Sequence, residues 1–511
     1  MNNKLYIRRG GVIIIALLIM ACSAFKYSKG EVNYLNSDAT WHTLLTVQAY
    51  SETPFRIHKF LPIVSLGSPD DKNIPWGACV PDKHGNFYYT SFSPVAYILP
   101  FLFFKTFHLP VSEMSLYLLN SLLYALSAIL WLLLLQKIFK KSPLAEYISF
   151  FGTIVYAFSP ELFHGMGIVY WSQSVFQVSF ILQLLCYYNW RFEKSEKYRF
   201  LFYAFCLLNP YIEWSGFVAN GGFAVAELVN HWRTDKHKAI CSFCIIGFIT
   251  CLSFALFCFH YLLNVNPRIF FATVKRRFFA RNITTAVRLL SLVVGYLYSF
   301  SWMWGAFFVL LAVSCRKRKF FIESFTGHRT LLFLTLFPVL ENLIMKEHAV
   351  SYTYDRMKLA FFISLCACIL LCNIFSNCKN IRRAKILIAI LIVFCGVANI
   401  KSYKNNLRYI WNADYRVANK QFADYINTHY SDAVFGLQDL SVRGYANMLF
   451  DCGIYERANK ENLIEIAKTK DKNYVVLLHA ESEKWNLYKF TFAEIFDVNT
   501  GERFVHHATD F

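Results

Sequence analysis

Charged residues are scarce in this sequence, and acidic residues are the scarcer kind. Only 17% of the 511 residues are charged, and 33 Asp and Glu stand against 52 Lys and Arg. Soluble globular proteins are about 25% charged and about 45–50% apolar, whereas 56% of this chain is hydrophobic. The composition excludes an ordinary soluble domain and indicates a membrane protein.

Several common signatures are absent as well. The sequence has no Gly-rich phosphate-binding loop, no internal repeat and no low-complexity tract. Cys241 and Cys244 have the CxxC spacing, but no second pair accompanies them, so a zinc site is not indicated. Only Cys79 and Cys452 lie in segments that we expect outside the cytoplasm, and a disulfide between them remains open.

Long apolar runs fill the first 400 positions. Runs of about 17–25 apolar residues can cross roughly 30 Å of hydrocarbon as helices. These runs lack the alternation of barrel strands. We therefore predict an all-α multi-pass membrane bundle of 11–13 spans in residues 1–401, followed by a small soluble α/β domain in residues 402–511.

The positive charge is unevenly distributed. Residues 402–511 contain 13 Lys and Arg and 15 Asp and Glu, so the net charge of +19 comes entirely from short clusters between the apolar runs. Basic residues of membrane proteins collect in cytoplasmic loops. The pattern argues against nucleic acid as a partner and predicts a cytoplasmic N-terminus and an extracytoplasmic C-terminal domain.

Alternation of the spans makes three further predictions. With the orientation that the basic clusters indicate, the run 93–109 cannot be a full crossing of the membrane, so it is expected to be re-entrant. The alternative is that the boundary of one span is misplaced. The stretch 199–230 should cross twice, with its turn at Asn209-Pro210, and 289–313 should be one span. An uncleaved first span at 12–24 is favoured over a signal peptide, and it leaves the long polar loop 26–92 outside.

The candidate functional residues lie in the outer loops. Asp38 and His42 are one helical turn apart in a helix predicted from Asp38 to Ser51. The other candidates are Glu161 and His164 at the outer end of a span, Arg276 and Arg277 in a basic and aromatic run, Glu213 within the membrane, and His348, Tyr352, Asp355, Arg356 and Lys358 in the polar run 341–358.

Each candidate also has a purely structural interpretation. Asp38 could only cap its helix, and Asp70 and Asp71 beside a proline are better explained as turn residues. The basic run at 268–288 could reach lipid headgroups and do nothing else. The run 341–358 is harder to explain in this way, because a connection of a few residues would suffice between two spans.

Together these residues are suited to one kind of reaction. A carboxylate outside the membrane can act as general base on an acceptor hydroxyl, and Arg and Lys can stabilise a phosphate leaving group. A donor with a long lipid tail would explain why the site is built into a membrane. Sugars linked to a lipid phosphate meet these requirements.

The layout resembles the GT-C superfamily of polyprenyl-phosphate-sugar-dependent glycosyltransferases, which includes protein O-mannosyltransferases and lipid A aminoarabinose transferases. Four features are similar: an Asp soon after the first span (Asp38), the aromatic entry Tyr88 to Pro94, Ser159-Pro160-Glu161 at the end of a span, and the run His348 to Arg356. Two features depart from the family pattern, because a second Pro is absent and Ala39 follows Asp38 where an acidic residue would form a pair. The departure at Ala39 leaves open both the identity of the base and a divalent metal as cofactor.

The resemblance implies an inner-membrane enzyme of the bacterial cell envelope with a periplasmic C-terminal domain. It would move a sugar, with inversion, from a polyprenyl phosphate to a glycolipid, lipopolysaccharide, surface glycan or protein. Asp38 would be the base, and the other candidates would bind donor or acceptor. A surface-polysaccharide polymerase or ligase, and a non-enzymatic transporter or flippase of lipid-linked glycans, remain alternatives.

Overall fold

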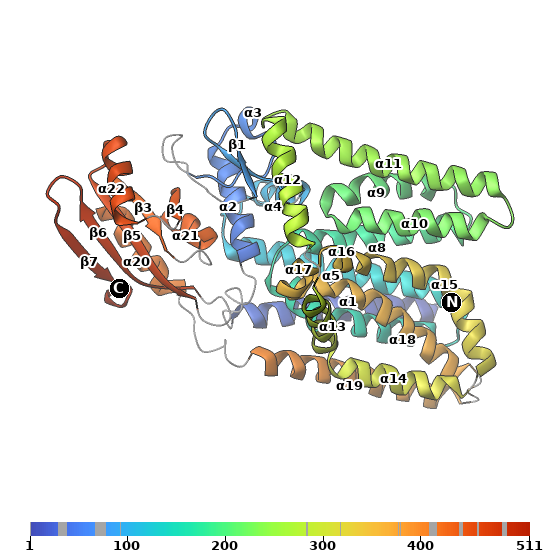
Figure 1. Cartoon of the computed structure of the whole chain (residues 1–511). Helices are drawn as coiled ribbons and strands as arrows, with labels where there is room; N and C mark the ends of the chain where they lie inside the picture. The colour runs from blue at the N-terminus through green and yellow to red at the C-terminus, as the bar shows by residue number, and fades with distance from the viewer. Residues whose placement is uncertain are drawn as a thin grey trace.

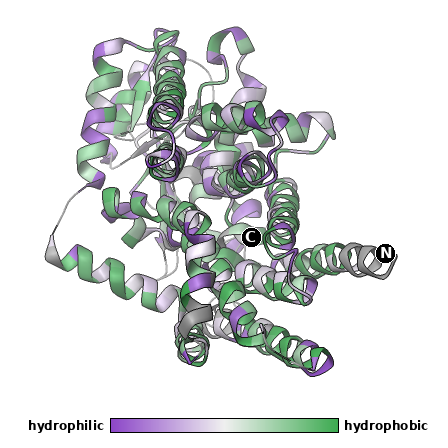
Figure 2. Cartoon of the chain, turned by 90° about the vertical axis from the view of Figure 1, so that its right-hand side faces the viewer, coloured by the Kyte–Doolittle hydropathy of each residue, from purple (hydrophilic) through white to green (hydrophobic). Residues whose placement is uncertain are grey.

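The computed structural model describes residues 2–28, 38–66, 78–91, 93–282, 285–316, 318–376, 378, 380–407, 416–438, 443–456, 459–482 and 488–511. Long helices run side by side, α12 crosses them near one end, and a sheet domain lies beyond α2 at that same end (Figure 1). The N-terminus lies at the opposite end of the helices. Hydrophobic residues predominate along most helices of the bundle (Figure 2).

The helices, including three 3₁₀ helices (η), are α1 (Asn2–Ser28), α2 (Asp38–Glu52), α3 (Phe55–His58), α4 (Val95–Thr106), α5 (Glu113–Ile138), α6 (Ala145–Ala157), α7 (Pro160–Ile168), α8 (Ser172–Arg191), α9 (Lys197–Ile212), α10 (Ser215–His231), α11 (Lys236–Leu262), α12 (Pro267–Arg281), α13 (Ala286–Phe300), α14 (Trp302–Cys315), α15 (Arg318–Leu336), η2 (Phe337–Leu340), α16 (Glu341–Ile344), α17 (Lys346–Ser351), η3 (Thr353–Lys358), α18 (Leu359–Phe375), α19 (Ile381–Leu407), α20 (Arg416–His429), α21 (Arg443–Phe450), α22 (Lys460–Thr469) and η5 (Ala508–Asp510). The strands are β1 (Cys79–Pro81), β2 (Phe87–Tyr89), β3 (Ala433–Leu437), β4 (Ile454–Glu456), β5 (Tyr474–Ser482), β6 (Tyr488–Asp497) and β7 (Arg503–His507).

The predicted class, a helical membrane bundle with a small α/β domain, is confirmed. Among the described residues, five helices are long and apolar enough to cross a membrane, or six if the bent pair α13 and α14 forms one span. Shorter and more polar helices such as α8, α9 and α10 pack among them. The count of 11–13 spans stays a prediction.

The C-terminal sheet has the strand order β4-β3-β5-β6-β7. The pairs β3–β4 and β3–β5 are parallel, and β5–β6 and β6–β7 are antiparallel. The domain packs on α2, because Trp41 lies against Tyr445 of α21 with ring centroids 4.4 Å apart. The helix that begins at Asp38 is therefore enclosed by protein on both sides.

The turn predicted at Asn209-Pro210 is wrong. Pro210 lies inside α9, and the chain breaks at Glu213 and Trp214, between α9 and α10. A proline removes one helical N–H, and Asn220 Nδ2 donates to the carbonyl oxygen of Cys206 that this leaves open, at 2.7 Å. A neighbouring helix thus lets the proline stay in the helix.

The segment predicted as a single span at 289–313 is sharply bent, and it stays a prediction that its two helices cross the membrane as one span. The axes of α13 and α14 differ by 80°, and Ser301 between them has a φ of 43°, a conformation that non-glycine residues adopt rarely. Within the run 93–109 only the 12 residues of α4 are helical. At 1.5 Å per residue this helix is about 18 Å long. That length is short for a full crossing.

The polar loop predicted to begin at residue 26 begins later. Helix α1 continues to Ser28, and Lys26 is buried with its Nζ donating to the Phe163 carbonyl oxygen at 2.7 Å. The loop then contains α2, α3 and the β1–β2 hairpin. None of the fifteen cysteines is disulfide-bonded, so no bridge joins Cys79 and Cys452.

Candidate active site

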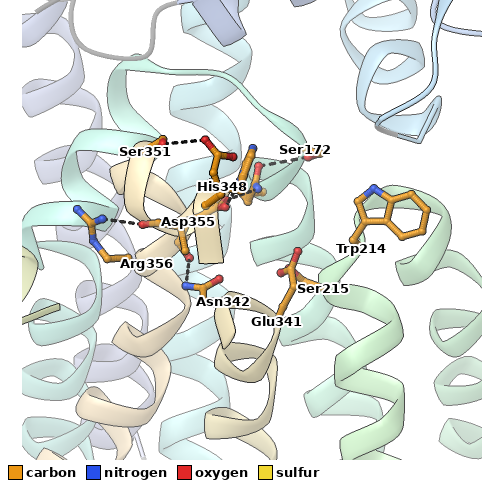
Figure 3. Close-up of polar contacts among 12 residues, drawn as sticks. Ser172, Trp214, Ser215, Glu341, Asn342, His348, Ser351, Asp355 and Arg356 are labelled. Carbon is orange, nitrogen blue, oxygen red and sulfur yellow. Dashed lines mark hydrogen bonds and ion pairs between the residues drawn. The ribbon is translucent and has the colours of Figure 1, made fainter. Parts of the chain in front are cut away.

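The polar run 341–358 folds into α16, α17 and η3, between α15 and α18. It is buried: Asp355 is 2% exposed, Arg356 4% and Lys358 0%. An isolated charge in such surroundings is expensive unless it is paired and hydrogen-bonded. The partners of these three side chains, partly visible in Figure 3, therefore explain how the run folds.

Asp355 lies at the centre of this cluster. Its carboxylate is hydrogen-bonded to Nδ1 of His348 from α17 and accepts from Nε2 of Gln173, at the start of α8, at 2.6 Å. The ring of Tyr352 packs on His348 with centroids 4.4 Å apart. Arg281 of α12 interacts electrostatically with the same carboxylate. Four elements thus meet at one acid.

Lys358 is held by a second carboxylate. Its Nζ forms an ion pair with Glu341 and donates to Asn342 Oδ1 at 3.2 Å. Ser215, in the first turn of α10, donates to the same Glu341 (Figure 3). Glu213, beside that turn, accepts from Ser172. The break between α9 and α10 therefore delivers polar groups to the cluster.

Arg356 is held on a third side. Its Nε donates to Ser299 Oγ and its Nη1 to the Ala349 carbonyl oxygen, both at 2.7 Å. Glu161, at the start of α7, lies 3.6 Å from Nη2. A Cβ at Gly295 would stand 3.1 Å from Nη1, so the glycine lets α13 approach the guanidinium closely.

Helix α2 is joined to this centre through aromatic rings. His42 packs edge-on against Tyr89 and Trp171, with centroids 4.3 and 5.9 Å away. Trp171 lies 6.4 Å from Tyr354, the neighbour of Asp355. The backbone N–H of Tyr170 donates to Thr40 Oγ1 at 3.2 Å. Asp38 begins α2, but its side chain, like that of His164 in α7, lies outside the described residues.

A groove borders the centre on the side of α12. It is a cavity of about 510 Å³ lined by Trp214, Phe254, Phe271 and Phe278 among apolar residues, and by Lys275, Arg277 and Arg281 among cations. Arg277 Nε also donates to Ser91 Oγ at 3.3 Å. Of the two predicted arginines, Arg277 lines this groove. Arg276, the next residue on the helix, does not.

The described side chains do not fit a divalent metal site. Within the described part of the chain, no group of three or more His, Cys, Asp or Glu is placed to hold an ion. The carboxylate of Glu161 faces Arg356, and that of Asp355 is taken up by His348 and Gln173. We assign no step to a metal.

The structure thus brings together six of the predicted site residues: Glu161, His348, Tyr352, Asp355, Arg356 and Lys358. His42 is connected to them through the ring of Trp171. Sequence reasoning missed Gln173 and Ser215, which carry no charge and lie far from the run in sequence. Lys275 and Arg281 fall within the basic run 268–288, but the sequence analysis assigned them no individual role. The spacing 274, 278 and 281 on one helical face could have indicated the groove.

Comparisons with known proteins identify the fold. No family model and no curated protein matches this sequence. The apo oligosaccharyltransferase of Archaeoglobus fulgidus is similar in structure, with a TM-score of 0.57 and 12% sequence identity. The match covers 92% of this chain and 69% of the oligosaccharyltransferase chain. AglB from the same organism, in complex with an inhibitory peptide and a dolichol-phosphate, has a TM-score of 0.55 and 11% sequence identity. This match covers 94% of this chain and 70% of the AglB chain.

A third structure, the A. fulgidus enzyme tethered by a disulfide to an acceptor peptide with the NVT sequon, matches 92% of this chain over 69% of its own. Its TM-score is 0.56 at 11% identity. Oligosaccharyltransferases of this kind are GT-C glycosyltransferases, so the likeness confirms the GT-C fold that the sequence resemblance implied. At such low identity the likeness shows the fold, and activity has to be argued from the site.

Proposed function

We propose that this protein is an integral membrane glycosyltransferase that moves one sugar from a polyprenyl-phosphate donor to an acceptor hydroxyl outside the cytoplasm. The acceptor is a glycolipid, a surface glycan or a protein, and the membrane is the inner membrane of a bacterium. The GT-C fold supports the class of reaction. One of its structural neighbours was solved with a dolichol-phosphate, another with an acceptor peptide.

The observation that carries the proposal is the groove on α12. A lipid-linked phosphate has an apolar tail and a compact anionic head. The groove offers Trp214, Phe254 and Phe278 for the first, and Lys275 and Arg277 for the second. Cations that face a cavity can take up phosphate through charge-assisted hydrogen bonds. Arg281 connects the groove to Asp355, so a bound phosphate would lie beside the buried centre.

In the proposed reaction, Asp38 accepts the proton of the acceptor hydroxyl. The acceptor oxygen forms a bond to the anomeric carbon, and the bond from that carbon to the phosphate oxygen breaks. Polyprenyl phosphate leaves with the electron pair, and Lys275 and Arg277 stabilise its charge. Attack from the face opposite the leaving group inverts the configuration.

The buried centre has a different role in this proposal. Asp355, Arg356 and Lys358 make hydrogen bonds and ion pairs to other protein groups. They would hold α8, α10 and α13 in place around the groove rather than bind substrate themselves. A preorganised site of this kind keeps its donors fixed while charge develops in the transition state.

Binding of a fluorescent polyprenyl phosphate to the protein in nanodiscs tests the proposal. The double variant K275Q/R277Q removes two cations from the groove and should weaken binding by roughly tenfold or more. Arg268 lies exposed in the first turn of the same helix and does not line the groove, so R268Q is the matched control and should bind like the parent. Equal binding by all three proteins would exclude the groove as the donor site.

A further inference from the structure

A second cavity lies at the other end of the bundle, far from the proposed active site. It has a volume of about 840 Å³ and is formed where α8, α10 and α15 approach one another and α11 begins. The turn that joins α10 to α11 lies at the end of the helices farthest from the sheet domain (Figure 1). Neither the proposed reaction nor the C-terminal domain uses this cavity.

One wall of the cavity is a buried polar cluster that contains an ion pair. Glu227 of α10 is 0% exposed. It forms an ion pair with Arg191 at the end of α8 and accepts from Tyr187 OH at 2.9 Å. The Arg191 guanidinium also lies 3.5 Å from the centroid of the Trp190 ring. These contacts fix the wall without the help of a ligand.

The rim has a surplus of cations. Lys194, Lys238 and Arg329 line the cavity and are exposed, and none forms an ion pair with a residue that the structure describes. Of the three lining carboxylates, that of Glu227 is taken by Arg191 and that of Glu196 lies 3.1 Å from Arg199. Three unpaired cations therefore face only one uncommitted carboxylate.

The cavity lies at one end of a candidate membrane span. Lys238 is in the first turn of α11, which is one of the candidate membrane spans. If α11 crosses the membrane, the rim of the cavity lies at the level of the lipid headgroups. Phe192 and Ile322 on the lining are 44% and 52% exposed. Apolar side chains beside unpaired cations at this depth match the two ends of an anionic phospholipid.

We propose that this cavity binds the phosphate of an anionic phospholipid from the leaflet on the side of the basic clusters. The headgroup would lie between Lys238 and Arg329, and its acyl chains would leave the cavity past Phe192 and Ile322. The inference concerns a site separate from the groove on α12. It does not depend on the proposed transfer reaction.

Thermal unfolding of the delipidated full-length protein in detergent tests the proposal, with phosphatidylglycerol and phosphatidylcholine as probes. Phosphatidylglycerol should raise the melting temperature by about 3 °C at saturation, and phosphatidylcholine should raise it by less than half as much. The variant K238Q/R329Q should lose most of the phosphatidylglycerol shift. K141Q/R383Q, which removes two exposed basic residues outside the cavity, should keep it.

A steric variant tests the cavity independently of charge. A Cβ at Gly327 of α15 would meet nothing within 4 Å, although Gly327 lines the cavity. G327W should therefore fill the cavity without disturbing the helix and should abolish the shift. G396W, at a glycine of α19 that also faces open space, should not.

Four outcomes of the lipid experiments would overturn the proposal: no shift with phosphatidylglycerol, equal shifts with both lipids, an equal loss of shift in K238Q/R329Q and its control, or a full shift in G327W. The last measurement is the shift in melting temperature with glycerol phosphate in place of lipid. A full shift with it would mean that the site takes a soluble phosphate and would overturn the assignment to lipid.

Discussion

The buried centre and the groove on α12 each contain cations, and the surroundings of the two sets differ. Arg356 and Lys358 are almost completely buried, and each is bonded to acidic or polar protein groups. Lys275 and Arg277, on α12, line an open groove between aromatic side chains. Arg281 lines the groove and also interacts with Asp355 of the buried centre.

The difference follows from the cost of burying charge. A cation taken out of water has to be paired by the protein itself, so a buried cation is part of the framework and is poorly suited to take up a ligand. A cation on an open groove keeps its hydration until a ligand replaces it. Removing the first kind should therefore damage the fold, whereas removing the second should damage binding.

The largest expected effect is in the buried centre. K358M leaves the carboxylate of Glu341 buried without its cation, and breaking a buried pair in this way costs about 3–5 kcal/mol. We expect little folded protein, measured as monodisperse yield in detergent and as melting temperature. The double variant E341L/K358M removes both charges and should recover most of the loss. A melting temperature of K358M equal to that of the parent would contradict the pairing.

The next effect is on catalysis without loss of fold. D38N keeps the shape of the side chain but removes the proposed base, so transfer should fall by about 10²–10⁴-fold at unchanged protein level. The measurement is the surface glycan of cells that carry the variant, together with the pool of unused lipid-linked donor, which should accumulate. An unchanged glycan would remove Asp38 as the base and would favour the transporter alternative.

The smallest effect is expected where the two regions meet. Arg281 lines the groove and interacts with Asp355. R281Q should therefore lower both the stability of the fold and the affinity for polyprenyl phosphate, each to a moderate extent. We expect a moderate loss of stability, because the buried Asp355 carboxylate loses a favourable electrostatic interaction, together with weaker polyprenyl-phosphate binding. A variant that loses stability alone would place Arg281 in the framework, and one that loses binding alone would place it with Lys275 and Arg277.

The run 341–358 shows how far the sequence reaches. Its excess of ionisable residues over what a short connection needs marked it as a candidate, and His348 and Asp355 do bond within it. The remaining partners of Asp355 come from α8 and α12. Gln173 is separated from it by 182 positions, and no local pattern distinguishes that amide from any other.

The breaks in the helices show the same limit. The Asn209-Pro210 pair carries a strong local turn signal, yet the chain continues as a helix because Asn220 of α10 satisfies the carbonyl group that the proline leaves open. The bend at Ser301 has no proline or glycine to mark it. In the first place a neighbouring helix decided the outcome, and in the second no local signal marked the bend.

The sequence by itself determined the class of this protein, because hydrophobic length and the uneven distribution of charge depend on composition along the chain and not on contacts. It also determined most of the C-terminal elements. The sequence pattern predicts strands at 434–437, 474–478 and 488–496 and helices at 442–451 and 459–468, and β3, β5, β6, α21 and α22 lie within a few residues of these ranges. The tertiary structure alone decided which cations are paired and which face a cavity. That choice depends on the partners that distant helices bring to each charge, and burial makes those partners obligatory.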